Sequence, residues 1–183
     1  SMLIDKPMPA FELSTVDGEP VTNTDLPDQV FLLNVWGSYC LPCLVEHPTF
    51  MRLSEEGEIP VVGVNYKDEI NLAQGWLETN GNPFAFSIQD GNGRFGIDLG
   101  VYGAPETYLV DANGVIRYRH VSVLDETVWA EEFLPAIAER CLQHEIEFGC
   151  TPFYLNAVEE LLPYVDFYKI ASYELLWHEL LRA

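Results

Sequence analysis

Two cysteines separated by two residues, Cys40-Leu41-Pro42-Cys43, stand where a short apolar run gives way to a predicted helix. The run Phe31–Trp36 is typical of a buried strand, and residues 37–39 break it. Cys40 then opens a helix that we expect to continue to about Leu53. Unpaired backbone N–H groups and the helix dipole stabilise a thiolate at such a junction. The second cysteine lies one turn further on, close enough to form a disulfide with the first.

Strand candidates alternate with helical segments along the first 140 residues. The strongest hairpin signal is Asp111-Ala112-Asn113-Gly114, whose Asn-Gly tip stands between two β-branched runs. Apolar periodicity predicts the other elements. Strands are expected at 59–65, 84–88, 107–110 and 115–119, and helices at 69–78 and 127–141. This order predicts an α/β fold with a thioredoxin-like mixed sheet and helices on both of its faces.

Composition excludes several classes of protein. Hydrophobic residues make up 48% of the chain, which excludes intrinsic disorder. The balance of 29 acidic and 9 basic residues, with a net charge of −20, argues against nucleic-acid binding because phosphate backbones would repel the chain. We predict no membrane-spanning segment and no signal peptide, since there is neither a long apolar run nor a leader pattern after Ser1.

The cysteine pair permits two chemistries. In the redox interpretation Cys40 attacks the disulfide of a partner and Cys43 resolves the mixed disulfide. In the alternative, Cys40, Cys43 and His47 are spaced like three zinc ligands, and Cys141, Cys150 or another histidine supplies the fourth. We favour the redox interpretation, with no metal and no cofactor beyond the disulfide itself. His47 is then an ordinary surface or core histidine.

Further candidate residues stand near the pair or near Pro105. Pro105 is either the cis proline that faces the disulfide in thioredoxin-like folds or a plain strand-initiating proline, and we favour the first. If Glu46 and Glu106 approach the cysteines, their charge raises the thiol pKa values and they could relay a proton. Otherwise they are simply two of the 29 acidic residues. Taken by themselves, Trp36 and Tyr39 are expected to be packing residues.

Several separated motifs in order make the chain similar to a known family. The residues 34–43 with Glu46-His47 resemble the active-site segment of CcmG/DsbE proteins, the thioredoxin-like thiol:disulfide oxidoreductases of cytochrome c maturation. The resemblance covers about residues 3–140 and continues through Gly63–Asp68, Gly81–Pro83, Gly100–Thr107, Ile116–His120 and Val128-Trp129.

The resemblance implies a location, partners and roles. Such proteins face the bacterial periplasm on an N-terminal inner-membrane helix, which we expect this chain to lack. They take electrons from a membrane thiol reductase and help to reduce the Cys-x-x-Cys-His of apocytochrome c, directly or through a partner. Cys40 and Cys43 correspond to the attacking and resolving cysteines. The acidic surroundings and substrate groove would comprise Glu46, Tyr102, Pro105 and Glu106, with Trp36, Tyr39 and Ala104 also contacting substrate. Tyr39 is a departure, because the family commonly has tryptophan there.

Residues 141–183 lie beyond this resemblance and are expected to form an appendage to a domain of residues 1–140. Patterning predicts a β-α-β-α order with a parallel crossover, at 146–148, 154–162, 165–170 and 173–181. Residues 150–153 and 167–174 resemble pieces of a sialic acid synthase (β/α)₈ barrel. The resemblance implies that Thr151, Lys169 and Ser172 match residues that hold phosphoenolpyruvate in that family.

A quarter of a barrel cannot close, so we predict no synthase activity. We favour a fusion as the origin of the appendage, over a natural extension that docks on the sheet or a segment that pairs between chains. An exposed parallel pair would also favour a homodimer formed through the tail. Cys141 and Cys150 could be disulfide-bonded or free. The alternative to a redox enzyme is a binding module, in which the Cys-x-x-Cys is structural or holds zinc and the tail supplies the interaction surface.

Overall fold

The computed structural model describes residues 3–57, 59–143, 149–150, 159 and 162–168. The chain divides into two compact units, Ser1–Asp125 and Glu126–Ala183. This division precedes the helix that sequence patterning assigned to the first domain. The boundary at residue 140 stays a prediction.

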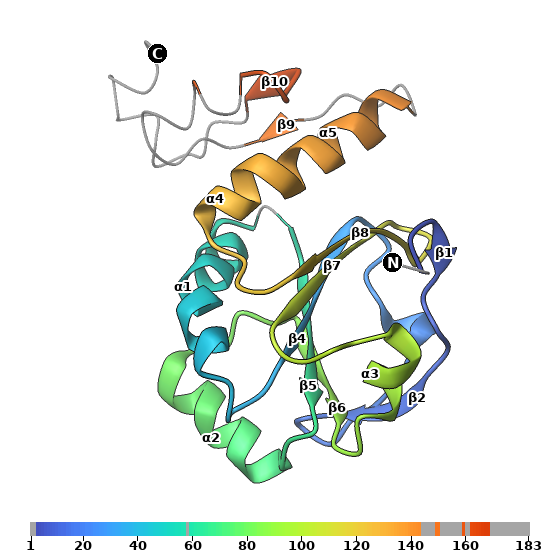
Figure 1. The fold of residues 1–183 in the computed structure, drawn as a ribbon, viewed down its shortest axis with the longest axis vertical. Helices are drawn as coiled ribbons and strands as arrows, with labels where there is room; N and C mark the ends of the chain where they lie inside the picture. Colours follow the sequence, from blue (N-terminus) through green and yellow to red (C-terminus); the bar gives the residue numbers. More distant parts are fainter. Residues whose placement is uncertain (1–2, 58, 144–148, 151–158, 160–161, 169–183) are drawn as a thin grey trace. The chain divides into compact units, whose positions relative to one another are not determined.

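The first unit is built on one mixed sheet (Figure 1). Among the described residues it has eight strands in the order β1-β8-β7-β4-β5-β6-β2-β3. The central strand β4 (Phe31–Trp36) pairs in parallel with β5 (Val61–Tyr66), and β5 pairs in parallel with β6 (Phe86–Asp90). On its other side β4 is antiparallel to β7 (Glu106–Val110), which forms the predicted hairpin with β8 (Val115–Val121). The edge strands are β1 (Lys6–Pro7) and β3 (Pro20–Thr22), and β2 (Glu12–Thr15) lies between β6 and β3.

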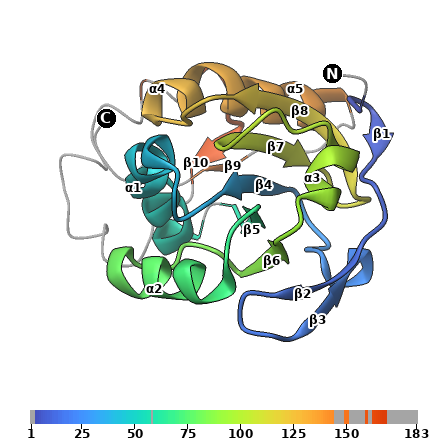
Figure 2. The same ribbon diagram turned by 60° about the horizontal axis from the view of Figure 1, so that its bottom comes forward.

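Helices lie on both faces of this sheet, as predicted. Figures 1 and 2 show α1 (Leu41–Glu56) and α2 (Ile70–Asn80) on one face and α3 (Arg94–Leu99) on the other. The two larger helices share a face because each belongs to a parallel crossover, β4-α1-β5 and β5-α2-β6, and such crossovers are right-handed. The α3 face holds an apolar core cluster, to which Phe95 and Leu99 contribute.

Strands β4 to β8 and helices α1 and α2 confirm the sequence predictions, with ends that shift by one to three residues. Sequence patterning did not predict β1, β2, β3, α3 or the 3₁₀ turn η1 (Asn23–Asp25). Strands β1, β2 and β3 are two to four residues long and alternate weakly in burial. The six residues of α3 are too few to establish a helical period. The missed elements are therefore the shortest ones.

The second unit begins with one helical segment, which agrees with the helix predicted over 127–141. It consists of α4 (Glu126–Val128), the π-helical turn η2 (Trp129–Phe133) and α5 (Leu134–Gln143). Strands β9 (Gly149–Cys150) and β10 (Phe167–Tyr168) pair in parallel, as the expected crossover requires. The predicted strand 146–148, the helix 173–181 and most of the helix 154–162 lie outside the described residues. Cys141 is a free, half-buried thiol, so the alternative disulfide with Cys150 is wrong.

Candidate functional site

A disulfide joins Cys40 and Cys43 at the start of α1. Cys40 is the N-cap residue, and its Sγ accepts a hydrogen bond from the backbone N–H of Cys43 at 3.1 Å. Pro42 fits in this first turn, where a missing backbone N–H costs no helical hydrogen bond. Cys40 is 6% exposed and Cys43 2%. The first sulfur is therefore the better placed for both attack and stabilisation as a thiolate.

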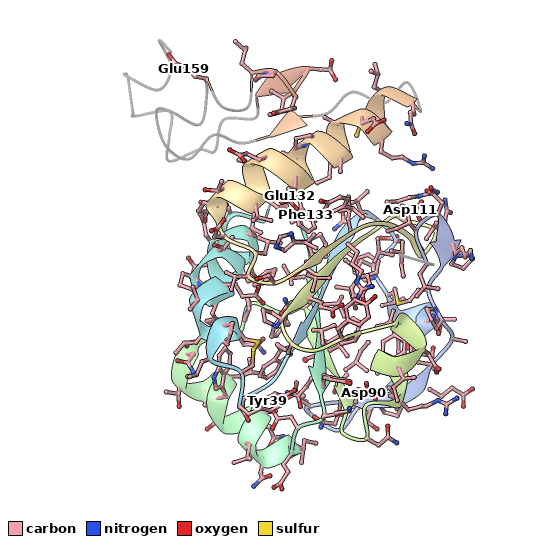
Figure 3. All side chains as sticks on the ribbon, in the orientation of Figure 1. Tyr39, Asp90, Asp111, Glu132, Phe133 and Glu159 are labelled. Carbon is pink, nitrogen blue, oxygen red and sulfur yellow. A yellow bond between two sulfur atoms is a disulfide. The ribbon has the colours of Figure 1, made fainter. Side chains whose placement is uncertain are left out.

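The surface around the disulfide is apolar. Tyr39 is 57% exposed, Leu41 78% and Val45 68%. Tyr39 lies where the chain enters α1 (Figure 3). Glu46 is the one charged residue between Tyr39 and Thr49, and it is buried. The exposed side chains of this segment are thus uncharged, on a strongly acidic chain.

Glu46 lies one helical turn after Cys43 and shares its buried face of α1. Its Oε1 accepts a hydrogen bond from Asn34 Nδ2 at 2.8 Å, and its Oε2 accepts one from the Leu124 backbone N–H at 2.9 Å. Burial raises the pKa of this carboxyl to about 7, although the two hydrogen bonds oppose the shift. Glu46 is therefore a proton acceptor poised near neutral pH, one turn from the less exposed cysteine.

Glu106 is also fully buried, but it belongs to the opposite face of the sheet. It pairs in register with Val35, and adjacent residues of a strand point to opposite faces, so Glu106 lies away from Asn34. Its Oε2 accepts hydrogen bonds from Arg119 Nη2 at 2.7 Å and from the Tyr108 hydroxyl at 3.1 Å. Its Oε1 accepts the Tyr102 backbone N–H at 2.7 Å. The Glu106 charge is thus neutralised locally by Arg119, and an assisting role at the thiols stays a prediction.

The loop before β7 brings Pro105 to the end of the sheet from which Cys40 is reached. The Ala104–Pro105 peptide bond is cis, as the preferred interpretation requires. Because Glu106 pairs with Val35, Pro105 lies at the level of Trp36, four residues before Cys40. Pro105 is buried and Ala104 half-buried, whereas Tyr102 is 84% exposed and lies under the Arg119 guanidinium at 4.7 Å.

Trp36 lies beneath the site, where it is held by packing and one hydrogen bond. The indole is 1% exposed, and its Nε1 donates to Ser87 Oγ at 2.9 Å. Phe84 stacks on the indole with ring centroids 5.4 Å apart. The ring centroid of Trp76 lies 5.2 Å from that of Trp36. A buried indole fits the first prediction for Trp36, that it is a packing residue. It does not fit the direct contact with substrate that the family resemblance implied.

His47 is held by helix α2. Its Nε2 lies 3.1 Å from both the Asn80 and the Gly81 carbonyl oxygens, and its ring meets Trp76 edge-on at 4.7 Å. Burial lowers the pKa of this imidazole, and the two carbonyl contacts only partly offset that effect. The three residues considered as zinc ligands therefore have other partners in this structure: Cys40 and Cys43 are bonded to each other, and His47 Nε2 contacts two carbonyl oxygens.

Sequence reasoning missed the residues that hold the loop in front of Cys40. Asp68 accepts hydrogen bonds from the Ser38 backbone N–H at 2.6 Å and from Ser38 Oγ at 2.8 Å. The Tyr39 hydroxyl donates to the Tyr66 carbonyl oxygen at 2.8 Å. Asp68 lies 30 residues after Ser38 in the sequence, so local patterning could not connect the two. The only sequence signal for Asp68 was its place in the segment Gly63–Asp68 that resembles the CcmG/DsbE family.

A disulfide at the N-terminus of a helix that follows a central parallel strand, with a cis proline at the same end of the sheet, defines a thioredoxin-like thiol:disulfide oxidoreductase. Comparisons with known proteins agree. The Redoxin family matches residues 4–133. The thiol:disulfide interchange protein DsbE of Pseudomonas aeruginosa is 48% identical over 137 residues, which are 74% of this chain and 76% of that protein. DsbE of Escherichia coli is 49% identical over 138 residues, 74% of each chain. The chain belongs to the DsbE family of thiol:disulfide interchange proteins.

Solved structures show the same fold at lower identity. A secreted Mycobacterium tuberculosis disulfide oxidoreductase homologous to E. coli DsbE matches with a TM-score of 0.56 and 17% identity, over 64% of this chain and 89% of that one. A secreted thiol-disulfide isomerase from Corynebacterium glutamicum matches with a TM-score of 0.61 and 23% identity, over 71% and 84% of the two chains. The predicted thioredoxin-like α/β fold is confirmed.

A second family, NeuB, matches residues 106–183 and overlaps the Redoxin match over residues 106–133. The match spans the segments that resemble a sialic acid synthase barrel. Thr151, Lys169 and Ser172 lie outside the described residues. A fusion origin and a homodimer formed through the tail therefore stay predictions.

Proposed function

We propose that this oxidoreductase works in the periplasm during cytochrome c maturation, where it reduces the disulfide of an apocytochrome c Cys-x-x-Cys-His segment or of a partner. Membership of the DsbE family and the active-site motifs of the CcmG/DsbE proteins support this role. The observation that carries the proposal is the geometry of Cys40. Cys40 is the more exposed residue of the pair, and its sulfur accepts a backbone N–H at the start of α1.

The proposed reaction begins with the reduced pair. The Cys40 thiolate attacks one sulfur of the partner disulfide, forming a Cys40–partner bond and releasing the other partner sulfur as a thiolate that takes up a proton. Cys43, once deprotonated, attacks Cys40 Sγ, restores the Cys40–Cys43 disulfide and releases the second partner thiol. Two electrons and two protons pass to the partner, and the pair ends oxidised.

Glu46 is the proposed acceptor of the Cys43 proton. Cys43 is 2% exposed and Glu46 1%, so water reaches neither readily. Both lie on one buried helix face, and the pKa of Glu46 at about 7 matches a group that exchanges protons near neutral pH. Asn34 and Leu124 hold the carboxylate in place.

The proposed substrate surface comprises Tyr39, Tyr102, Ala104 and Pro105. Tyr39 and Tyr102 are the exposed aromatic side chains here. Pro105, immediately before β7, is buried, has no N–H, and its carbonyl oxygen accepts the Ser122 N–H at 3.2 Å, so the backbone groups offered to a substrate would be those of Ala104. Glu106 supports this surface from the other face by fixing the Tyr102 backbone.

A membrane thiol reductase is the proposed electron donor, and an N-terminal membrane helix is the proposed anchor of the native protein. Both proposals rest on the family resemblance. Among the described residues, no helix is long and apolar enough to cross a bilayer.

The test compares the reduction rates of two disulfide substrates. The reduced chain is mixed with an oxidised Cys-x-x-Cys-His peptide from an apocytochrome c and, separately, with insulin, and disulfide exchange is followed by mass spectrometry. The proposal expects fast reduction of the peptide and slow reduction of insulin. Equal rates would indicate a general reductant, and no reaction with the peptide would contradict the proposed substrate.

The alternative binding module finds less support, because Cys40 and Cys43 are bonded to each other and His47 Nε2 contacts two carbonyls. Zinc titration of the reduced chain separates the two functions. Stoichiometric binding that blocks reoxidation would favour the module, and a reversible two-electron transition favours the oxidoreductase.

A further inference from the structure

The loop 37–39 that carries the chain from β4 into Cys40 is a single turn, in which the Cys40 backbone N–H donates to the Gly37 carbonyl oxygen at 3.1 Å. Each of its two central residues is fixed by residues 66–68, which comprise the last residue of β5 and the start of the following loop. The Ser38 backbone N–H and Oγ donate to Asp68 Oδ2 and Oδ1 at 2.6 and 2.8 Å, and the Tyr39 hydroxyl donates to the Tyr66 carbonyl oxygen. The position of Cys40 is therefore set from a neighbouring strand.

Asp68 is itself held from several directions. Asn65 Nδ2 donates to Asp68 Oδ2 and Gln89 Nε2 donates to the Asp68 carbonyl oxygen, both at 2.9 Å. Asn65 and Gln89 are cross-strand partners on β5 and β6, and both amide groups turn their donors toward Asp68. The Glu69 backbone N–H completes the set on Asp68 Oδ1 at 2.9 Å. The carboxylate thus has four donors in a fixed arrangement.

Two features of the surrounding chain fit this arrangement. Lys67 has a φ of 51°, in the left-handed region that a lysine rarely adopts, and its N–H donates to the Asp90 carbonyl oxygen at 2.9 Å. A Cβ on Gly37 would lie 2.5 Å from the Tyr39 ring, so this ring packs closely over the turn. Both loops adopt conformations that bring Asp68 against the residues preceding Cys40.

The Asp68 charge also acts on this turn. Burial and, secondarily, the negative charge of Asp68 raise the pKa of the Tyr39 phenol, and Tyr39 immediately precedes Cys40. No basic residue contacts Asp68 among the described residues, since its partners are hydroxyl, amide and backbone groups. The negative charge is therefore not cancelled by an ion pair, in contrast to that of Glu106.

We propose that Asp68 is a positioning residue for Cys40: it fixes the 37–39 turn through Ser38 and keeps a negative charge behind that turn, which opposes the Cys40 thiolate and favours the disulfide. This inference rests on the proposed attack by Cys40 and adds a residue outside the Cys-x-x-Cys segment to the groups that set its redox equilibrium. A carboxylate held in this way counteracts the helix dipole, so the dithiol form is a stronger reductant.

The experiment compares Asp68→Asn with Glu69→Gln in the full chain. In Asp68→Asn the amide oxygen can remain the acceptor of the Ser38 backbone N–H and Asn65 donors at the Oδ2 position, while the amide nitrogen replaces Oδ1 and the charge is removed; the Glu69 N–H then loses its acceptor. Glu69→Gln removes an equal charge at the next, exposed residue. The Cys40 pKa is read from the pH dependence of iodoacetamide alkylation of the reduced chain, followed on the Cys40 peptide by mass spectrometry. The disulfide equilibrium is read in glutathione buffers.

Asp68→Asn is expected to lower the Cys40 pKa by about half a unit and to shift the glutathione equilibrium toward the dithiol. Glu69→Gln is expected to change neither. An unchanged Cys40 pKa in Asp68→Asn, a change of melting temperature alone, or an equal shift in Glu69→Gln would overturn the proposal. Should Asp68→Asn not fold, Asp68→Ser, which also keeps an acceptor oxygen, takes its place with the same expected direction. In the unmodified chain, equal alkylation of Cys40 and Cys43 would contradict the proposed attack by Cys40, a result separate from the effect of Asp68.

Discussion

Asn34 of β4 and Glu46 of α1 are joined in the protein interior by a 2.8 Å hydrogen bond from the Asn34 amide to a carboxylate whose pKa is raised to about 7. The bond places the titrating group against the central strand that leads to the disulfide. Burial of a carboxyl at this point opposes its ionisation, so the site retains a proton that a surface glutamate would have lost.

Glu46 makes folding stability depend on pH. Its folded pKa exceeds the ordinary value of 4.5, so the folded protein binds more protons than the unfolded chain between about pH 4.5 and pH 7. The free energy of unfolding contributed by this group therefore falls as pH rises through that window, by about 3 kcal/mol in total. Glu46→Gln is expected to flatten this slope in urea titrations at several pH values. Glu55→Gln, on an exposed position of the same helix, should leave the slope as it is; an unaltered slope in Glu46→Gln would contradict the raised pKa.

The two cysteines are expected to behave differently when replaced. Cys40→Ser should abolish disulfide exchange, whereas Cys43→Ser should accumulate the mixed disulfide with the partner, detectable by non-reducing electrophoresis and mass. Cys141→Ser is the control, because that thiol is free, and it should retain activity. Normal product release by Cys43→Ser would reverse the assignment of the attacking and resolving cysteines.

Glu106 is expected to matter for folding more than for thiol chemistry. Glu106→Gln leaves the Arg119 guanidinium, whose side chain is 8% exposed, without its ion-pair partner. Removing one member of a buried pair typically costs about 3 kcal/mol or more. Urea unfolding should show this loss, while alkylation should leave the Cys40 pKa near its original value. The double variant Glu106→Gln/Arg119→Gln should recover part of the stability, and a large fall in the Cys40 pKa would instead place Glu106 in the thiol environment.

Gly63 and Gly75 form a matched pair of glycines for testing the packing below the site. A Cβ on Gly63 would lie 2.5 Å from Ser87 Oγ and 2.8 Å from Trp36 Nε1, whereas one on Gly75 meets nothing within 4 Å. Gly63→Ala is expected to destabilise the chain by about 1–3 kcal/mol through overpacking. Gly75→Ala, inside α2, should stabilise it by about 0.5–1 kcal/mol. Both are measured by thermal unfolding, and equal effects would contradict the close contact at Gly63.

The elements that the sequence predicted well are those whose signal is local. β4, α1 and the β7–β8 hairpin each follow from an apolar run, a cap or an Asn-Gly turn within a few residues. The hydrogen bonds to Glu46 and Asp68 could not be predicted in this way. Leu124 lies 78 residues from Glu46, and Asp68 lies 30 from Ser38, so only the completed sheet brings each pair together.

Glu106 illustrates a different limit of sequence reasoning. Its place beside Pro105 suggested proximity to the thiols, and its chain position is indeed at that end of the sheet. Strand alternation decides the rest, because it directs the side chain to the face of Tyr108 and Arg119, while Asn34 and Thr107 share the other face with Glu46. The register of β4 against β7, which sequence patterning does not specify, settles which carboxylate lies on the α1 side.

The hydrogen bond from Leu124 to Glu46 also sets a lower limit on any shortened version of the protein. Every residue assigned to the thiol chemistry, from Trp36 to Glu106, precedes Leu124. A fragment that ends after β8 (Val115–Val121) would keep Cys40, Cys43, the cis peptide bond and the eight-stranded sheet. Its Glu46 carboxylate would nevertheless lose the hydrogen bond from the Leu124 backbone N–H. A shortened version that keeps both hydrogen-bond donors of Glu46 therefore ends no earlier than Leu124.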